Sequence, residues 1–184
     1  MKYLKTCLNK ILKIKKEGFV IDLGCGEGKL TKFFLSKGFN VTAIDNSEEN
    51  VDKLKKNLKR FGNKVKIVKT NLEEFSFDKD YDVIIAKNVL HFLSNEKAKE
   101  LIEEIKNHTK KDGINLIIGL TIKDRFYNKK RFFIKEREMK KMYKGWNFLF
   151  FKSFFMLDKH DGLPPHKHHI FIGLFQKAKA QLKA

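Results

Sequence analysis

The segment from Val20 to Gly28 constrains the fold of this chain more than any other part of the sequence. It reads VIDLGCGEG, an apolar run and an aspartate followed by glycines at alternate positions, and it opens into the helical pattern KLTKFF. Strand, glycine-rich turn and helix in this order form the ligand pocket at the carboxyl edge of parallel sheets. Glycines let the backbone approach a ligand closely, and the helix that begins near Gly28 offers unpaired N–H groups. We therefore expect a ligand to lie on this turn.

The residues around the turn indicate which ligand it suits. A dinucleotide turn reads G-x-G-x-x-G or G-x-G-x-x-A, but counting from Gly24 places Lys29 where the last small residue belongs. Asp22 would repel a pyrophosphate, whereas it can accept hydrogen bonds from a ligand ammonium group. Asp45 ends the next apolar run, 23 residues after Asp22, where a carboxylate can accept both hydroxyls of a ribose. A zwitterionic amino-acid tail therefore suits the turn better than a pyrophosphate.

Apolar runs and helical patterns alternate along the rest of the chain. Beyond the first strand, we expect strands at Phe39–Asp45, Val65–Val68, Asp82–Ala86, Ile114–Thr121, Phe148–Leu157 and His169–Phe175. Helices are expected over residues 1–17, as a leading helix, and after the glycine turn, at Ser47–Phe61, at Asn95–His108 and at Glu136–Tyr143. This alternation predicts a parallel sheet with helices on both faces. The last two strands have no helix between them and should pair antiparallel.

Length and composition fit one domain that covers residues 1–184. The chain has 184 residues, of which 42% are hydrophobic, and no Pro/Gly/Ser-rich stretch divides it. Its two cysteines, Cys7 and Cys25, give no disulfide framework and suggest a reducing compartment. No apolar run approaches the roughly 20 residues of a membrane span. We expect a cytoplasmic protein with no membrane partner; the sequence does not indicate an oligomeric state.

The net charge of +18 raises the question of a nucleic-acid partner. Only four of the 40 basic residues are arginine, whereas phosphate recognition favours the guanidinium fork. Lysines spread along the helices are typical of a solvated surface. The one dense basic patch is Lys123–Lys135, where cations alternate with Phe126, Tyr127, Phe132 and Phe133. This patch keeps RNA open as a partner, although a small molecule is the expected one.

Several of these residues together form a pattern that resembles the motifs of the class I S-adenosylmethionine-dependent methyltransferases. The match rests on Asp22, on Gly24, Gly26 and Gly28, on Asp45, on Asn71 after the third strand and on Asp82–Ala86 as the fourth. Later motifs resemble the tellurite-resistance (TehB-like) type, namely Phe133–Trp146, Asp80–Ile85 and Val89–Leu93. The resemblance covers residues 18–177. It implies a Rossmann-like three-layer α/β sandwich with a mostly parallel seven-stranded sheet and an antiparallel last strand.

The resemblance also implies where S-adenosyl-L-methionine would bind. Asp22 and the backbone from Gly24 through Cys25 to Gly26 would hold the methionine part, with Lys87 near the sulfonium. Asp45 would hold the ribose, beside Asn46, and Asn71 with Leu72 would border the adenine. Many family members carry an acid where Asn71 stands; Asn71 accepts through its carbonyl oxygen but without charge.

Residues after the fourth strand and in the last third of the chain are candidates for the acceptor side. We expect His91 and His160 to be catalytic, and the expected substrate contacts are Asn88, Phe92, Trp146, His166 and His168. In the family a His-Arg pair before the last strand is linked to the acceptor; here His160 is the nearest match and Asp161 replaces the Arg. The histidine string 166–169 can ligate zinc, but metal sites usually draw on separated elements, so we expect no metal. At most His166 and His168 share one face of a strand.

The expected activity is methyl transfer to a small nucleophile, such as a chalcogen oxyanion or a thiol. In-line displacement on a sulfonium needs mainly a positioned acceptor and the exclusion of water. Two alternatives remain open: an RNA methyltransferase that uses the Lys123–Lys135 patch, and a cofactor-binding regulator without catalysis.

Overall fold

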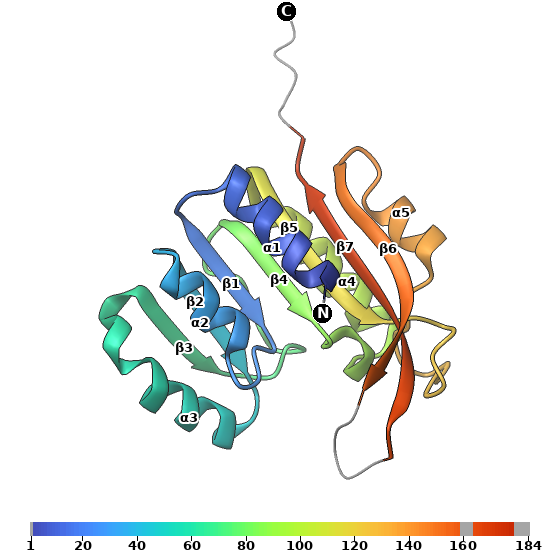
Figure 1. The fold of residues 1–184 in the computed structure, drawn as a ribbon, viewed down its shortest axis with the longest axis horizontal. Coiled ribbons are helices and arrows are strands. Elements are labelled where there is room, and N and C mark those ends of the chain that lie inside the picture. The colour runs from blue at the N-terminus through green and yellow to red at the C-terminus, as the bar shows by residue number, and fades with distance from the viewer. Residues whose placement is uncertain (1, 159–163, 179–184) are drawn as a thin grey trace, which may run out of the picture.

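A seven-stranded sheet forms the middle layer of the protein, with helices on both of its faces (Figure 1). The structure is a computed structural model that describes residues 2–158 and 164–178. The strands are β1 (Phe19–Leu23), β2 (Asn40–Asp45), β3 (Val65–Lys69), β4 (Tyr81–Lys87), β5 (Thr109–Leu120), β6 (Asn147–Asp158) and β7 (His166–Gln176). Their order in the sheet is β3-β2-β1-β4-β5-β7-β6. The first five pair in parallel, and β7 runs antiparallel to both of its neighbours, as predicted.

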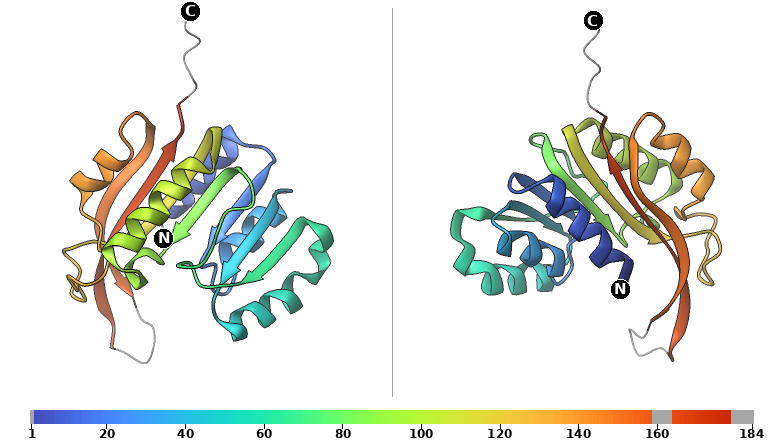
Figure 2. Two further views of the ribbon diagram at one scale, coloured as in Figure 1. Left: turned by 180° about the vertical axis from the view of Figure 1, so that it is seen from behind. Right: turned by 45° about the horizontal axis from the view of Figure 1, so that its top comes forward.

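The helices divide between the two faces because consecutive strand residues point to opposite sides of the sheet. They are α1 (Lys2–Ile14), α2 (Lys29–Ser36), α3 (Glu48–Leu58), α4 (Asn95–Asn107) and α5 (Glu136–Met142). Val20 and Val83 pack with α1, α2 and α3 in one apolar core. Ile21 and Ile84 belong to the other core, with α4 and α5 (Figure 2). The buried central strands therefore separate two cores.

Four element boundaries differ from the sequence expectation by three residues or more, and one of them is the start of β7, at His166 rather than His169. The leading helix ends at Ile14, short of residue 17, and the helix expected to reach Phe61 ends at Leu58 and continues as the 3-10 turn η1 (Lys59–Lys64). β5 begins at Thr109 rather than Ile114, and Asp112, which has a φ of 60°, lies in an irregularity within it. The sequence pattern therefore did not show that strand pairing begins before this irregularity.

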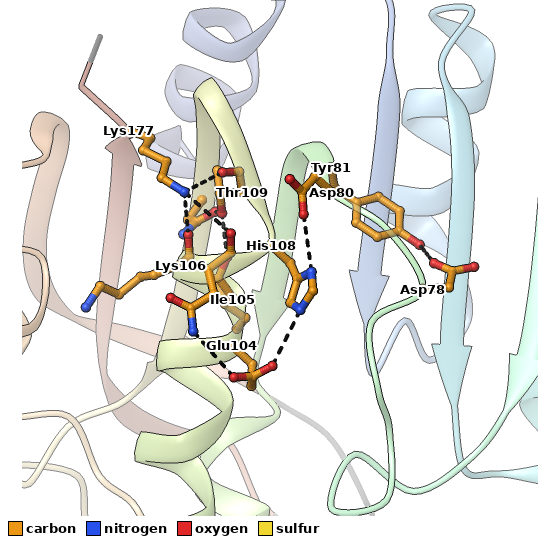
Figure 3. Close-up of polar contacts among 11 residues, drawn as sticks. Asp78, Asp80, Tyr81, Glu104, Ile105, Lys106, His108, Thr109 and Lys177 are labelled. Atoms are coloured by element: carbon orange, nitrogen blue, oxygen red, sulfur yellow. Dashed lines mark hydrogen bonds and ion pairs between the residues drawn. The ribbon is translucent and has the colours of Figure 1, made fainter. Parts of the chain in front are cut away.

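The edge of the sheet where β5 begins and β7 ends is fixed by polar contacts (Figure 3). Lys177 Nζ donates to the carbonyl oxygens of Lys106 and Thr109, at 3.0 and 2.7 Å, and so satisfies acceptors at the carboxyl end of α4. His108 lies between carboxylates, with Nδ1 3.2 Å from Asp80 Oδ1. These contacts leave the opposite, carboxyl edge of the parallel strands for the ligand.

Among the described residues, none of the helices combines the length and the apolar character that crossing a membrane requires.

Phe34→Ala should destabilise the protein by about 3–5 kcal/mol, because it empties a fully buried site in the α2 core. Chemical denaturation measures the change in unfolding free energy. Phe155→Ala is the matched control, since that ring is 63% exposed and its loss should cost less than about 1 kcal/mol. Equal losses in the two variants would contradict the assignment of the core.

Candidate functional site

The glycine turn after β1 has backbone conformations that other residues rarely adopt. Gly24, Gly26 and Gly28 have φ values of 64°, 54° and 72°. A Cβ on Gly24 would lie 2.1 Å from Val89 Cγ1, whereas one on Gly26 would meet nothing within 4 Å. Close packing against Val89 therefore requires a glycine at position 24. At Gly26 no side chain covers the backbone, which faces an open space.

Asp45 ties this turn to the end of β2. Its Oδ2 accepts from the amide of Gly26 at 2.7 Å, and its Oδ1 accepts from Ser47 N at 3.0 Å and from Asn50 Nδ2 at 3.1 Å. A carboxylate offers about four acceptor positions, so about one remains for a ligand without rearrangement. The amide of Cys25 is also used, because it donates to Ile44 O at 2.8 Å. The sequence expectation that these turn amides hold the ligand therefore does not fit this arrangement.

Asp22 lies at the end of β1 and is almost completely buried, with 2% of its surface exposed. Thr31 Oγ1 donates to its Oδ2 at 2.7 Å. Desolvation raises the pKa of the Asp22 carboxyl to about 6, although Thr31 and the nearby Lys87 lower it in part. A cationic group of a ligand would replace the lost hydration and favour the carboxylate.

Two adjoining cavities, each about 420 Å³, lie along the carboxyl edge and share Gly24, Gly26 and Asn88. The first also has as lining residues Asp45, Asn46, Ser47, Asn50, Thr70, Asn71, Leu72, Val89, Phe92 and Leu93. The second also has as lining residues Leu4, Asp22, Cys25, Glu27, Lys29, Leu30 and Lys87. All nine predicted cofactor residues thus line one continuous cleft, which α1 borders through Leu4. Asn71 Oδ1, expected to face adenine, accepts from Glu73 N at 3.3 Å.

The cleft lies where the direction of strand succession reverses. β2 and β3 follow β1 on one side, and β4 and β5 lie on its other side, so the chain leaves the carboxyl ends of β1 and β4 in opposite directions. Asn88, the first residue after β4, has a φ of 57°, and among the described residues its buried Oδ1 has no hydrogen-bond partner. An asparagine in this backbone conformation whose buried side-chain oxygen has no donor marks a place where an N–H or O–H group of a ligand would donate a hydrogen bond.

His91 and Phe92 follow in the 3-10 turn η2 (Leu90–Phe92). The centroids of their two rings are 4.4 Å apart. Phe92 lines the first cavity and is 67% exposed. Desolvation lowers the pKa of His91 to about 4, so its imidazole is neutral at pH 7. Its Nδ1 is buried and has no hydrogen-bond partner within the part of the chain that the structure describes.

His166 and His168 lie at the start of β7 and are both buried. Their Nε2 atoms are 3.0 Å apart, which confirms that the two side chains share one face of the strand. Asp124, which the sequence analysis missed, lies 3.0 Å from His168 Nδ1. His160, the other predicted catalytic residue, lies outside the described residues.

Trp146 does not reach the cleft. It follows α5, its ring is 5.2 Å from that of Tyr143, and Lys177 Nζ lies over it. Trp146 therefore lies at the edge of the sheet where β5 begins, opposite the cleft. The expectation of a substrate contact was wrong because the sequence motif does not show at which edge of the sheet the end of α5 lies. Residues 2–158 and 164–178 contain no group of three or more His, Cys, Asp or Glu side chains that could hold a metal ion.

The basic patch is only partly a surface feature. Phe126 and Tyr127 are 45% and 48% exposed, but Phe132 and Phe133 are 5% and 7% exposed and belong to the two cores. Half of the aromatic residues expected to face an anionic partner therefore pack inside the protein.

Two solved structures share this fold. The crystal structure of TehB from Haemophilus influenzae superposes with a TM-score of 0.83 at 24% identity, covering 94% of this chain and 62% of that one. The N-methyltransferase NodS from Bradyrhizobium japonicum, in complex with S-adenosyl-l-homocysteine, gives a TM-score of 0.73 at 14% identity, covering 96% of this chain and 86% of that one. At these identities the likeness shows the fold.

The sequence itself shows the family. The model of the tellurite resistance protein TehB matches residues 3–161, and this chain belongs to that family. A probable S-adenosyl-L-methionine-dependent methyltransferase TehB from Haemophilus influenzae is 29% identical over 132 residues, which are 71% of this chain and 46% of that protein. A ubiquinone biosynthesis O-methyltransferase from Rickettsia felis is 34% identical over 98 residues, 53% of this chain and 39% of that protein. The chain thus spans about half the length of the curated relatives it matches, or less.

Asp22→Asn should increase stability at neutral pH in the ligand-free protein. The pKa of Asp22 is raised from 3.8 to about 6, so its contribution is fully present below pH 4 and is lost as the pH rises through 6. Asparagine stays neutral and still accepts from Thr31. Denaturation from pH 4 to pH 7 should show the variant gaining about 1–3 kcal/mol over the natural protein. Asp52→Asn, at an exposed position of α3, should leave the pH profile unchanged; a constant difference in Asp22→Asn would refute the buried charge.

Proposed function

We propose that this protein is an S-adenosyl-L-methionine-dependent methyltransferase that transfers the methyl group to a small-molecule nucleophile. One observation carries the proposal. The cleft at the switch point between β1 and β4 combines an aspartate at the end of each of two strands, Asp22 and Asp45, with a glycine turn whose backbone lines the space between them. Its two arms match the two ends of that cofactor. A relative in the family is named as a probable S-adenosyl-L-methionine-dependent methyltransferase, which supports the cofactor and the reaction type of the proposal.

The second cavity suits the amino-acid end of the cofactor. Asp22 would accept from the ammonium group, and Lys87, which lines the same cavity, would pair with the carboxylate. Cys25 borders this end through its backbone. The glycines leave space for the sulfonium near Asn88, where the two cavities join.

The first cavity suits the nucleoside. Asp45 would accept a ribose hydroxyl at its remaining position, and a second hydroxyl would displace Asn50 Nδ2 or the Gly26 amide. Asn46 borders the ribose, and Leu72 provides an apolar surface for adenine. Asn71 would contribute a neutral acceptor, so its contact with the exocyclic amine is weaker than that of a carboxylate.

The acceptor would enter beside Asn88 and Phe92. Methyl transfer from a sulfonium is an in-line displacement, so the protein contributes mainly by positioning the acceptor atom and excluding water. The unsatisfied Asn88 Oδ1 can orient an acceptor that carries a proton. A thiol or another protonated acceptor would need a base, and the neutral His91 behind Phe92 is the candidate. A chalcogen oxyanion would need none.

RNA methylation is the second candidate function. It is favoured by the exposed part of the Lys123–Lys135 patch, where Phe126 and Tyr127 stand among exposed cations near the carboxyl edge. The burial of Phe132 and Phe133 weakens this candidate. A regulator that binds the cofactor without turnover is the third.

Asp45→Ala should weaken binding of S-adenosyl-L-methionine and its product at least a hundredfold, because the ribose loses its acceptor and the cleft loses three hydrogen bonds, one from the glycine turn and two from the start of α3. Isothermal titration calorimetry measures the affinity. Asp52→Ala, at an exposed site in α3, is the control and should bind as the natural protein does. Retained affinity in Asp45→Ala would rule out the proposed orientation.

Release of S-adenosyl-L-homocysteine should appear with a small acceptor in a panel of selenite, tellurite, thiols and thiopurines, and not with bulk RNA. The compact cleft between Asn88 and Phe92 is the reason to expect a small acceptor. Turnover only with RNA, lost as salt increases, would favour the second candidate. Cofactor binding without turnover of any acceptor would favour the regulator.

A further inference from the structure

The two outer strands of the sheet differ in how they meet solvent. β3 forms one outer edge and has five residues, of which Lys66 and Lys69 are cations that pair with carboxylates. A short edge strand that carries lysines discourages pairing with another chain. β6 forms the other outer edge, and within the described chain β7 is its only strand partner. The β3 edge therefore has features that protect it from association, and β6 is the edge to compare with it.

β6 has the composition of a strand that is paired on both sides. It is twelve residues long, and eight of them are phenylalanine, leucine or methionine. Its second half, Lys152–Asp158, includes Phe155 and Leu157, whose side chains are 63% and 66% exposed. Figure 1 shows β6 as the outermost strand on its side of the sheet. A long apolar strand whose outer edge has no strand partner among the described residues is a template for a further strand.

The one lysine of β6 does not protect this edge. Lys152 Nζ donates to the Tyr3 hydroxyl at 2.8 Å and lies 4.5 Å from the centre of the Tyr3 ring. A lysine protects an edge strand when its charge extends beyond the strand into solvent. The ammonium group of Lys152 is instead held over the face of the sheet that α1 covers.

The two charges of β6 are spaced so that a second copy of the strand complements them. Lys152 lies three residues before Phe155, and Asp158 lies three residues after it. In an antiparallel pair of two β6 strands with the twofold axis at Phe155, each Lys152 lies directly opposite Asp158 of the other copy. We propose that two molecules of this protein associate edge to edge through Lys152–Asp158, in this register.

The same register suits the other side chains of this half of β6. The opposed pairs are Ser153 with Leu157, Phe154 with Met156, and Phe155 with its own copy. Aromatic and apolar pairs of this kind stabilise antiparallel strands, whereas an axis at Lys152 would oppose two like charges. Neither charged group has to give up its present contacts, because an ammonium has three donors and a carboxylate has about four acceptor positions.

The distribution of charge favours a second copy over an oppositely charged partner. The protein has a net charge of +18, so two copies repel one another over most of their surfaces. β6 carries one cation and one anion, which makes it a neutral strip where two copies can meet. A nucleic acid would find no excess of cations along this strand. β5 and β7 separate β6 from β4, so the cleft stays accessible in the pair.

Sedimentation velocity of the natural protein between about 1 and about 200 μM tests the association. The protein should be a monomer at the lower concentration and a dimer at the higher one. Phe155→Lys should raise the dissociation constant at least tenfold, because it opposes two ammonium groups at the axis. Ile14→Lys is the matched control, since it adds the same charge at a side chain that is 40% exposed at the end of α1. It should dimerise as the natural protein does.

Exchange of the two charges tests the register. Lys152→Glu and Asp158→Lys should each weaken the dimer about threefold or more, because each variant creates two pairs of like charges across the axis. The double variant restores opposite charges at both places and should recover the affinity of the natural protein. Circular dichroism checks that each variant is folded.

Hydrogen exchange in the natural protein gives a readout that needs no variant. Backbone amides within Lys152–Asp158 should exchange more slowly at about 200 μM than at about 1 μM, and those of β3 should exchange equally at both. A monomer at every concentration, a dimer that Phe155→Lys leaves intact, or a double charge variant no better than the single ones would each overturn the proposal. The cleft is not part of this edge, so these results do not bear on the proposed methyl transfer.

Discussion

The candidate site depends on the Asp45 carboxylate. It is 8% exposed, and it joins the amide of Gly26 in the turn after β1 to the amide of Ser47 at the start of α3. These two hydrogen bonds hold the ends of two neighbouring strands and the beginning of a helix around one charged group. Hydrogen bonds to a charged acceptor are stronger than neutral ones, and here they keep the turn open in the absence of a ligand. The cleft is therefore largely formed before anything binds.

That arrangement has a cost at Asp22 and Asn88, on either side of the switch point. A buried carboxylate with a raised pKa and a buried oxygen without a partner in the described chain both destabilise the ligand-free protein. A bound cofactor with an ammonium and a sulfonium group would relieve the first cost, and a properly placed acceptor the second. Stability lost in the free protein is then recovered as binding free energy.

The region proposed for the acceptor is built differently. Its histidines come from η2 and from β7, and Asp124 comes from the segment between β5 and α5. No one segment forms this region, and its hydrogen bonds link side chains that are more than 40 residues apart. The antiparallel last strand makes this possible, because it brings the beginning of β7 to the same edge as the carboxyl ends of the parallel strands.

The sequence alone determined the fold class and the family, and it placed nine of the lining residues at the cleft, because the glycine turn and the acidic strand ends are local patterns that each span only a few residues. Strand alternation then fixes their common edge. Tertiary structure decided the rest. It placed Trp146 on the far edge, buried Phe132 and Phe133, used the Cys25 and Gly26 amides within the protein, and brought Asp124 to His168. Such contacts depend on how distant segments pack, and no local pattern of residue types records them.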